Sequence, residues 1–161
     1  MQSVTPINTP NTTTAFVPVQ GGWELRKIAM KASQAIADGC AVAVEVSGSS
    51  PTGYACLMPT TTSSGQNFVG ILAEKIATTD ADYATAGKLK LVWVPVDKTS
   101  EAVFTVGSGT FTAADVGRVC QFYSDSASLA VDTNGLGAII TKYISATKGQ
   151  CSFNVPNAVT A

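Results

Sequence analysis

The sequence predicts an all-β protein, folded as a β-sandwich or a partly open β-barrel of about nine to ten short strands. Apolar or alternating runs recur along the chain at a spacing of about ten residues. Clusters of Gly, Pro, Ser, Asp and Asn separate these runs and are typical of turns. Short strands at such regular spacing are typical of sandwiches and barrels.

The segment 67–96 shows the pattern most clearly, as a strand, a polar loop and a second strand. Residues 68–76 are apolar and rich in strand-favouring side chains. Residues 88–96 form a second run, in which Leu alternates with Lys at first and in which Pro95 marks a sheet edge or bulge. Residues 78–87 between them are polar, and we expect a capped surface loop there.

The remaining strands are expected on either side of this unit. A turn at Asp38-Gly39 and another at Asn134-Gly135 separate strands, and residues 112–117 predict one helical turn that Thr112 caps and Gly117 ends. In chain order, the expected strands cover residues 23–32, 40–46, 53–58, 102–106, 118–123, 129–131, 138–145 and 150–155. No internal repeat and no second domain is evident, so residues 23–161 are expected to form a single β-domain.

Residues 1–22 differ from the rest of the chain and predict an extended N-terminal arm. The segment has no charged residue and contains three prolines, which exclude a helix or a central strand. It still carries apolar side chains, which a purely disordered tail would seldom have, although a flexible tail is the alternative. We therefore expect the arm to lie across a neighbouring subunit. The side chains expected to contact a partner are Ile7, Phe16, Val17, Val19 and Trp23.

The composition indicates a surface made for contact. Charged residues are 13% of the chain, about half of the ~25% usual in globular proteins. Much of the polarity comes instead from 20 Thr and 14 Ser. Such a surface has little charge repulsion to keep copies apart, and a plain neutral extracellular domain is the alternative interpretation.

Nucleic acid and membranes are poor partners for this sequence. The net charge is −1 and the ten Lys and Arg are scattered, which gives no electrostatic footprint for nucleic acid or an anionic membrane. No apolar run approaches the roughly 18 residues that a membrane-spanning helix needs. Residues 1–22 lack the basic and apolar regions of a secretory signal, so we expect synthesis in a cytoplasm.

The four cysteines are expected to be buried free thiols. Cys40, Cys56, Cys120 and Cys151 form no C-x-x-C pair, and histidine is absent. A zinc site is therefore not expected. Cys40, Cys120 and Cys151 alternate with apolar residues on predicted strands, where small buried side chains are common. One or more disulfides is the alternative.

Neither calcium nor catalysis has a convincing signature. Asp80 and Asp82 lack the further ligands and the glycine of an EF-hand loop. The absence of histidine excludes Ser-His-Asp and Cys-His catalysis, and no phosphate-binding or dinucleotide-binding glycine pattern is present. We therefore expect no cofactor, no metal and no enzymatic activity.

Four features of the chain resemble the small decoration, or cement, proteins of tailed-phage capsids. They are the turn and strand at residues 36–42, the "VGIL" strand within residues 67–73, the Thr/Asp loop with GKLKL and GSGTF that follows up to Phe111, and the polar N-terminal arm. The resemblance covers much of residues 36–111 through short structural motifs. From Arg118 onward only the general rhythm of strands matches.

The resemblance implies a non-catalytic protein on the outer surface of a virion capsid. It implies that the major capsid protein and further copies of this chain, as a homotrimer, are the partners. It carries no individual binding residue over to this sequence. The alternative is a β-sandwich binding module on a virion or cell surface, such as a carbohydrate-binding or fibre domain, that uses exposed aromatics such as Tyr54, Tyr83 or Trp93.

Overall fold

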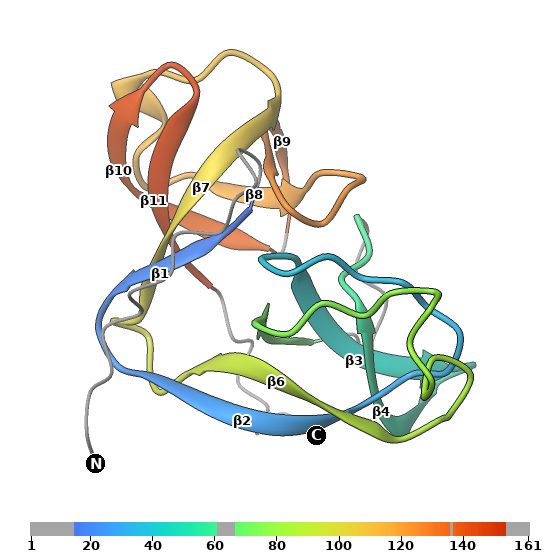
Figure 1. Cartoon of the computed structure of the whole chain (residues 1–161). Helices are drawn as coiled ribbons and strands as arrows, with labels where there is room; N and C mark the ends of the chain where they lie inside the picture. Colours follow the sequence, from blue (N-terminus) through green and yellow to red (C-terminus); the bar gives the residue numbers. More distant parts are fainter. Residues whose placement is uncertain (1–14, 61–66, 136, 154–161) are drawn as a thin grey trace.

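The computed structural model describes residues 15–60, 67–135 and 137–153, and these residues form an all-β protein. They contain eleven strands and one short 3-10 helix. Figure 1 shows the strands in two groups, one in the lower part of the view and one in the upper part. The predicted fold class is thus confirmed. The strand count exceeds the predicted nine to ten, and the strand that the sequence did not predict is the first, β1.

The lower group is a closed barrel of five strands, which we call barrel 1. Its strands follow one another around the ring in the order β2-β4-β3-β5-β6. Only the β2–β4 contact is parallel, and it consists of a single pair, Met30 with Ala55. The strands are β2 (Trp23–Met30), β3 (Ala41–Ser47), β4 (Ser50–Leu57), β5 (Phe68–Leu72) and β6 (Lys88–Pro95).

The upper group is a second ring, which we call barrel 2. Its sheet has the order β1-β7-β11-β10-β8-β9, and an additional parallel pairing of β9 with β7 closes strands β7 to β11 on themselves. Strand β1 lies outside this ring, paired with β7. The elements are β1 (Val17–Gln20), β7 (Glu101–Ser108), η1 (Ala113–Asp115), β8 (Val119–Phe122), β9 (Leu129–Asn134), β10 (Ala138–Ser145) and β11 (Lys148–Phe153).

The two barrels have the same topology, so the structure contains an internal repeat that the sequence analysis did not find. In barrel 1, β2 pairs with β6 and β4, β3 with β4 and β5, and β5 with β6. In barrel 2, β7 pairs with β11 and β9, β8 with β9 and β10, and β10 with β11. Each pairing keeps its direction, so β2 to β6 correspond in order to β7 to β11.

Equivalent backbone hydrogen bonds confirm the repeat at the residue level. Gly39, just before β3, donates its N–H to Leu72 O on β5 over 2.8 Å. Gly117, before β8, donates its N–H to Ile140 O on β10 over 2.7 Å. Both glycines have positive φ, 84° and 92°, which other residues adopt at a cost. The repeat is not evident in the sequence because equivalent strand positions carry different side chains, as at Leu25 and Glu101.

A shared hydrophobic cluster packs the barrels against each other. Phe68 of barrel 1 stacks on Phe153 of barrel 2 with ring centroids 4.2 Å apart. The same cluster holds Phe122, and Phe16 meets both barrel 2 rings edge-on. A separate cluster, with Met30 among its buried residues, fills the interior of barrel 1. That residues 23–161 form a single domain stays a prediction.

The loop between β8 and β9 fixes one barrel on the other. Ala41 of β3 donates its N–H to Ser126 O over 2.7 Å, and the Ser126 hydroxyl donates to Met58 O. Ser126 has a φ of 55°, unusual for a residue with a side chain. Asp125 holds the loop by accepting the N–H of Ala127 at 2.9 Å. The corresponding β3–β4 connection of barrel 1 is much shorter. The added length of the β8–β9 loop is therefore what reaches barrel 1.

Candidate interaction surface

The predicted partner contacts at Phe16 and Trp23 are corrected by the structure. Phe16 is fully buried between Phe122 and Phe153 of its own chain. Trp23 is also buried, and its indole N–H donates to Gln20 O and Glu101 O, each at 3.1 Å. Both side chains therefore make contacts within their own chain, where they join β1 to the two barrels.

The arm is shorter than predicted, because residues 15–22 belong to the body. Strand β1 pairs antiparallel with β7, with Val17 opposite Val103. Pro18, whose ring bars it from a central strand, is tolerated because β1 lies at a sheet edge. Val17 is half-buried and Val19 is 39% exposed, so of these two only Val19 presents much surface to a partner. Ile7 lies outside the described residues.

The outer side of the β2–β6 ladder carries mainly apolar side chains, interrupted by the exposed Lys27, and we call it the apolar face. It is built from three cross-strand pairs, each of which has its side chains on one side of the sheet. Leu25 is 45% exposed and Leu89 is 57% exposed, which is high for leucine. The three pairs are Leu25 with Trp93, Lys27 with Leu91, and Ala29 with Leu89.

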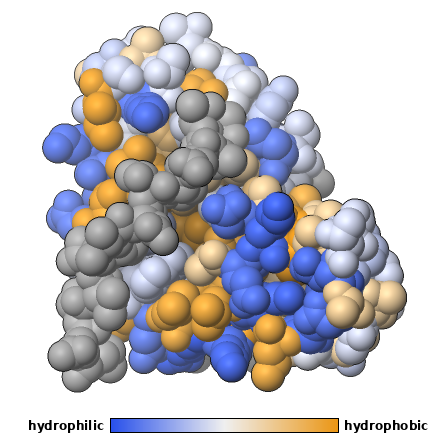
Figure 2. All heavy atoms as spheres, viewed as in Figure 1, coloured by the Kyte–Doolittle hydropathy of each residue, from blue (hydrophilic) through white to orange (hydrophobic). Residues whose placement is uncertain are grey.

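The apolar face is the uncovered end of a row that begins in the core. Ala41 on β3 pairs with Ile71 on β5, Ile71 pairs with Trp93 on β6, and Trp93 pairs with Leu25 on β2. Ala41 and Ile71 are buried under barrel 2, Trp93 is half-buried, and Leu25 is exposed. Figure 2 shows apolar residues, in orange, along the lower part of the molecule where β2 and β6 run. Barrel 2 thus covers only part of a continuous apolar surface.

Barrel 2 shows that the fold does not require this surface. The equivalent row there is Val119, Ile139, Ser152 and Glu101, so a polar pair occupies the place of Trp93 and Leu25. The next two pairs along β7 and β11 are Val103 with Gln150 and Thr105 with Lys148. The same ladder is therefore mainly polar in one barrel and mainly apolar in the other. An exposed apolar face that the fold does not need is typical of a contact with another molecule.

The alternation of Lys and Leu in β6 hid this face from sequence reasoning. Alternation normally places the apolar side chain inside, yet Lys88 and Lys90 are buried and Leu89 is exposed. Lys88 donates from Nζ to Lys31 O at 2.8 Å and to Tyr83 O at 2.7 Å. These bonds compensate the ammonium for the water that it loses on burial, and they hold residues 73–87 against the end of barrel 1.

Lys90 is held inside by the predicted Asp loop. Its Nζ lies 3.2 Å from an Asp82 carboxylate oxygen, 3.8 Å from one of Glu74 and 3.9 Å from one of Asp80. Burial by itself would lower the pKa of Lys90, but the hydrogen bond and charge of Asp82, with Glu74 and Asp80, raise it above its usual value. The two aspartates that the sequence marked therefore serve as partners of a lysine. Asp80 also accepts the N–H of Ala77, three residues before it, whereas the predicted cap would accept an N–H from the residues that follow.

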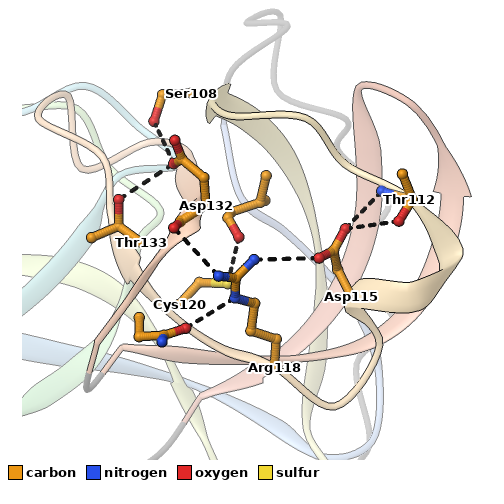
Figure 3. Close-up of polar contacts among 9 residues, drawn as sticks. Ser108, Thr112, Asp115, Arg118, Cys120, Asp132 and Thr133 are labelled. Carbon is orange, nitrogen blue, oxygen red and sulfur yellow. Dashed lines mark hydrogen bonds and ion pairs between the residues drawn. The ribbon is translucent and has the colours of Figure 1, made fainter.

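A second polar network, at the end of barrel 2, is shown in Figure 3. Arg118 donates from Nε to Asn134 Oδ1 at 2.9 Å and pairs with Asp115 Oδ1 at 3.4 Å. The Thr112 N–H, which donates to Asp115, is the largest cause that lowers the pKa of this carboxyl, and Arg118 adds to it. The network joins the turn at η1 to β9. It includes no activated nucleophile, and its cation is already paired.

The four cysteines are buried free thiols, as predicted. Burial raises the pKa of Cys40 and of Cys120 to about 11, and it raises that of Cys56 and of Cys151 as well. At neutral pH these groups are protonated thiols, which are poor nucleophiles and poor metal ligands. Among the described residues, no three His, Cys, Asp or Glu side chains gather as a metal site would require.

The aromatic residues suggested for sugar binding do not form an exposed platform. Tyr54, Tyr83 and Trp93 are each only partly exposed. The Tyr83 ring is engaged by Lys88, whose Nζ lies 5.6 Å from the ring centroid. Trp93 packs against the shared cluster between the barrels. The apolar face is therefore the best-supported contact surface in the described part of the chain.

Comparison with known proteins found no matching family model, no matching curated protein and no matching solved structure. Within the described ranges, no helix is long and apolar enough to cross a membrane.

Proposed function

We propose that this chain is a structural protein that binds the outer surface of a tailed-phage capsid and reinforces it. The observation that carries the proposal is the apolar face, which is exposed on barrel 1 and replaced by polar residues on barrel 2. Burial of Leu25 and Leu89 against a shell would contribute roughly 1.5–3 kcal/mol for each fully buried side chain. Repetition over many lattice sites would multiply that modest gain.

The composition and the rigidity of the body support the same role. A surface with 13% charged residues offers little repulsion between neighbouring copies, in keeping with a homotrimer on the shell. The stacked rings of Phe68, Phe122 and Phe153 hold the barrels as one body, which suits a protein that stiffens a lattice. The major capsid protein is the proposed partner, and the virion surface is the proposed location.

Binding to shells tests the proposal directly. Full-length protein is mixed with expanded shells assembled from the major capsid protein of the same virus, and bound protein is measured after sedimentation. We expect saturable binding and a higher melting temperature of the shell. The double substitution Leu25→Asp with Leu89→Asp should weaken binding at least about tenfold, because each charge must lose water at the contact.

A matched variant controls for the general effect of an added charge. Ile144 is 46% exposed but lies on β10, away from the apolar face. Ile144→Asp should bind shells as the unchanged protein does. A folded wild-type chain that fails to bind expanded shells would overturn the proposal, and equal loss for both variants would remove the apolar face from it.

A further inference from the structure

Among the described residues, the two barrels differ at one sheet edge, because barrel 1 has a position there that no described strand fills. In barrel 2, β1 lies along the first half of β7, with Val17 opposite Val103, Pro18 opposite Ala102 and Gln20 opposite Glu101. The equivalent half of β2 in barrel 1 spans residues 25–27, as the matching rows across the two sheets show. Among the described residues, no strand lies along that half of β2 on the side away from β6.

The backbone of β2 offers hydrogen-bonding groups at this edge. Further along the same edge, Lys31 donates its N–H to Ala55 O on β4 over 2.8 Å. Alternate residues of a strand direct their N–H and C=O groups to the same edge, so those of Leu25 and Lys27 point that way too. Within the described ranges neither residue pairs with a strand on that side, since β2 pairs with β4 only at Met30, and residues 25–27 are all exposed. An edge of this kind accepts a further strand.

The sequence contains a second segment with the character of β1. Strand β1 reads Val17-Pro18-Val19-Gln20, and residues 5–8 read Thr-Pro-Ile-Asn. Each has a β-branched residue, a proline, a β-branched aliphatic residue and an amide, in that order. The position of the proline matters, because proline has no N–H to donate. Pro18 stands opposite Ala102 on β7. A proline opposite the neighbour of Lys27 on β2 would occupy the equivalent position.

We infer that residues 5–8 of a neighbouring copy add to the free edge of β2 as β1 adds to β7. In the same register, Thr5 lies opposite Lys27, Pro6 opposite Arg26 and Asn8 opposite Leu25, antiparallel to β2. This inference rests on the proposed function, in which copies of the chain assemble side by side. In this inference the predicted N-terminal arm is a strand-addition segment, and its binding site is the edge of β2 in a neighbouring copy.

The length of the arm permits contact with a neighbour. From Thr5 to Ala15, where the described body begins, the chain spans up to about 33 Å when extended. The radius of gyration of a domain of this size is about 15 Å, so the reach is comparable to the width of the molecule. The arm is uncharged and pairs through its backbone, so the charges of Arg26 and Lys27 do not oppose it. In its absence these charges guard the edge against aggregation.

Disulfide trapping tests the inference without any capsid. One preparation carries Thr5→Cys and a second carries Lys27→Cys, and the two full-length proteins are mixed at high concentration and oxidised mildly. Because the four native cysteines are buried, the new thiols dominate the reaction. We expect mixed disulfide dimers, at least about tenfold more than with Thr5→Cys and Lys31→Cys, since a disulfide needs Cα atoms within about 7 Å.

Each result either supports or overturns the inference. Selective mixed dimers with Lys27→Cys support it. Lys27→Pro, which removes an outward N–H while leaving the β2–β6 bonds, should then reduce trapping between Asn8→Cys and Leu25→Cys, the pair that faces each other in the same register. Equal trapping at residues 27 and 31, or none, overturns it. So does a Thr5→Cys, Lys27→Cys double variant that forms only an internal bond. Shell binding without trapping would sink this inference alone, and trapping without shell binding would sink the proposed function alone.

Discussion

At the scale of single residues, Phe16 shows how far a side chain near the N-terminus can reach into the fold. Its ring lies 5.5 Å from that of Phe153 and 5.7 Å from that of Phe122, centroid to centroid. Its N–H donates to Gly39 O of barrel 1 over 3.0 Å. One residue before β1 therefore touches both barrels. Its contribution is to folding, whereas sequence reasoning had assigned it to a partner.

Phe16→Ala is expected to lower the free energy of unfolding by about 3–5 kcal/mol, because it leaves a cavity in the shared cluster. Urea unfolding followed by circular dichroism measures this loss. Val19→Ala, at a 39% exposed position on the neighbouring strand, is the control and should change stability by no more than about 0.5 kcal/mol. A Phe16→Ala protein as stable as the Val19→Ala protein would show that the ring does not belong to the core.

At the scale of elements, residues 73–87 are positioned by buried lysines of β6 as well as by Ile76, which is buried in the cluster inside barrel 1. Gly87 donates its N–H to Met30 O at 2.9 Å, and Ser33 donates its N–H to Tyr83 O at 2.9 Å. The Lys88 ammonium adds two hydrogen bonds, to Lys31 O and to Tyr83 O. The loop is thus a fixed part of barrel 1.

Lys88→Met is expected to loosen this loop while preserving the volume of the side chain. The substitution removes the ammonium donor from the carbonyls of Lys31 and Tyr83, of which Tyr83 O keeps the Ser33 N–H. The expected cost is about 1–3 kcal/mol if the Lys31 carbonyl then stays buried without a donor. Hydrogen exchange should become faster at the Gly87 and Ser33 amides. Lys75→Met, at an exposed position in the same segment, is the control. Unchanged exchange in the Lys88→Met protein would contradict the role assigned to Lys88.

At the scale of the whole molecule, two barrels of the same topology share one aromatic cluster and one clamping loop. Trp23 bridges them through Gln20 and Glu101, and Ser126 bridges them through Ala41 and Met58. Neither barrel can lose its partner without exposing the phenylalanine rings between them. The physical expectation is a single cooperative unit.

We expect the two barrels to unfold in one transition. Trp23 and Trp93 report on barrel 1 by fluorescence, and amide exchange at Ile140 reports on barrel 2. Val92→Ala, a change inside barrel 1, should lower the unfolding midpoint equally for both probes. A variant in which barrel 1 unfolds while Ile140 keeps its protection would instead make the barrels separate domains.

The sequence by itself determined the positions of most strands, several turns and the burial of the cysteines. These properties depend on neighbouring residues, as at residues 138–145, where the predicted and observed strands coincide, and at Thr112 and Gly117, which bound the short helical turn. Alternation also identified Cys120 and Cys151 as inward-facing. Local steric and hydrogen-bonding preferences suffice for all of these.

Only the tertiary structure decided which strands pair and which apolar side chains stay uncovered. The repeat depends on pairings between strands far apart in the chain, such as β2 with β6 and β7 with β11, which no local pattern encodes. The exposure of Leu25 and Leu89 depends on where barrel 2 stops covering barrel 1. The burial of Lys88 depends in part on the carbonyl of Lys31, which lies 57 residues away in the chain. Burial is a property of packed surfaces, so the candidate contact face became visible only once both barrels were in place.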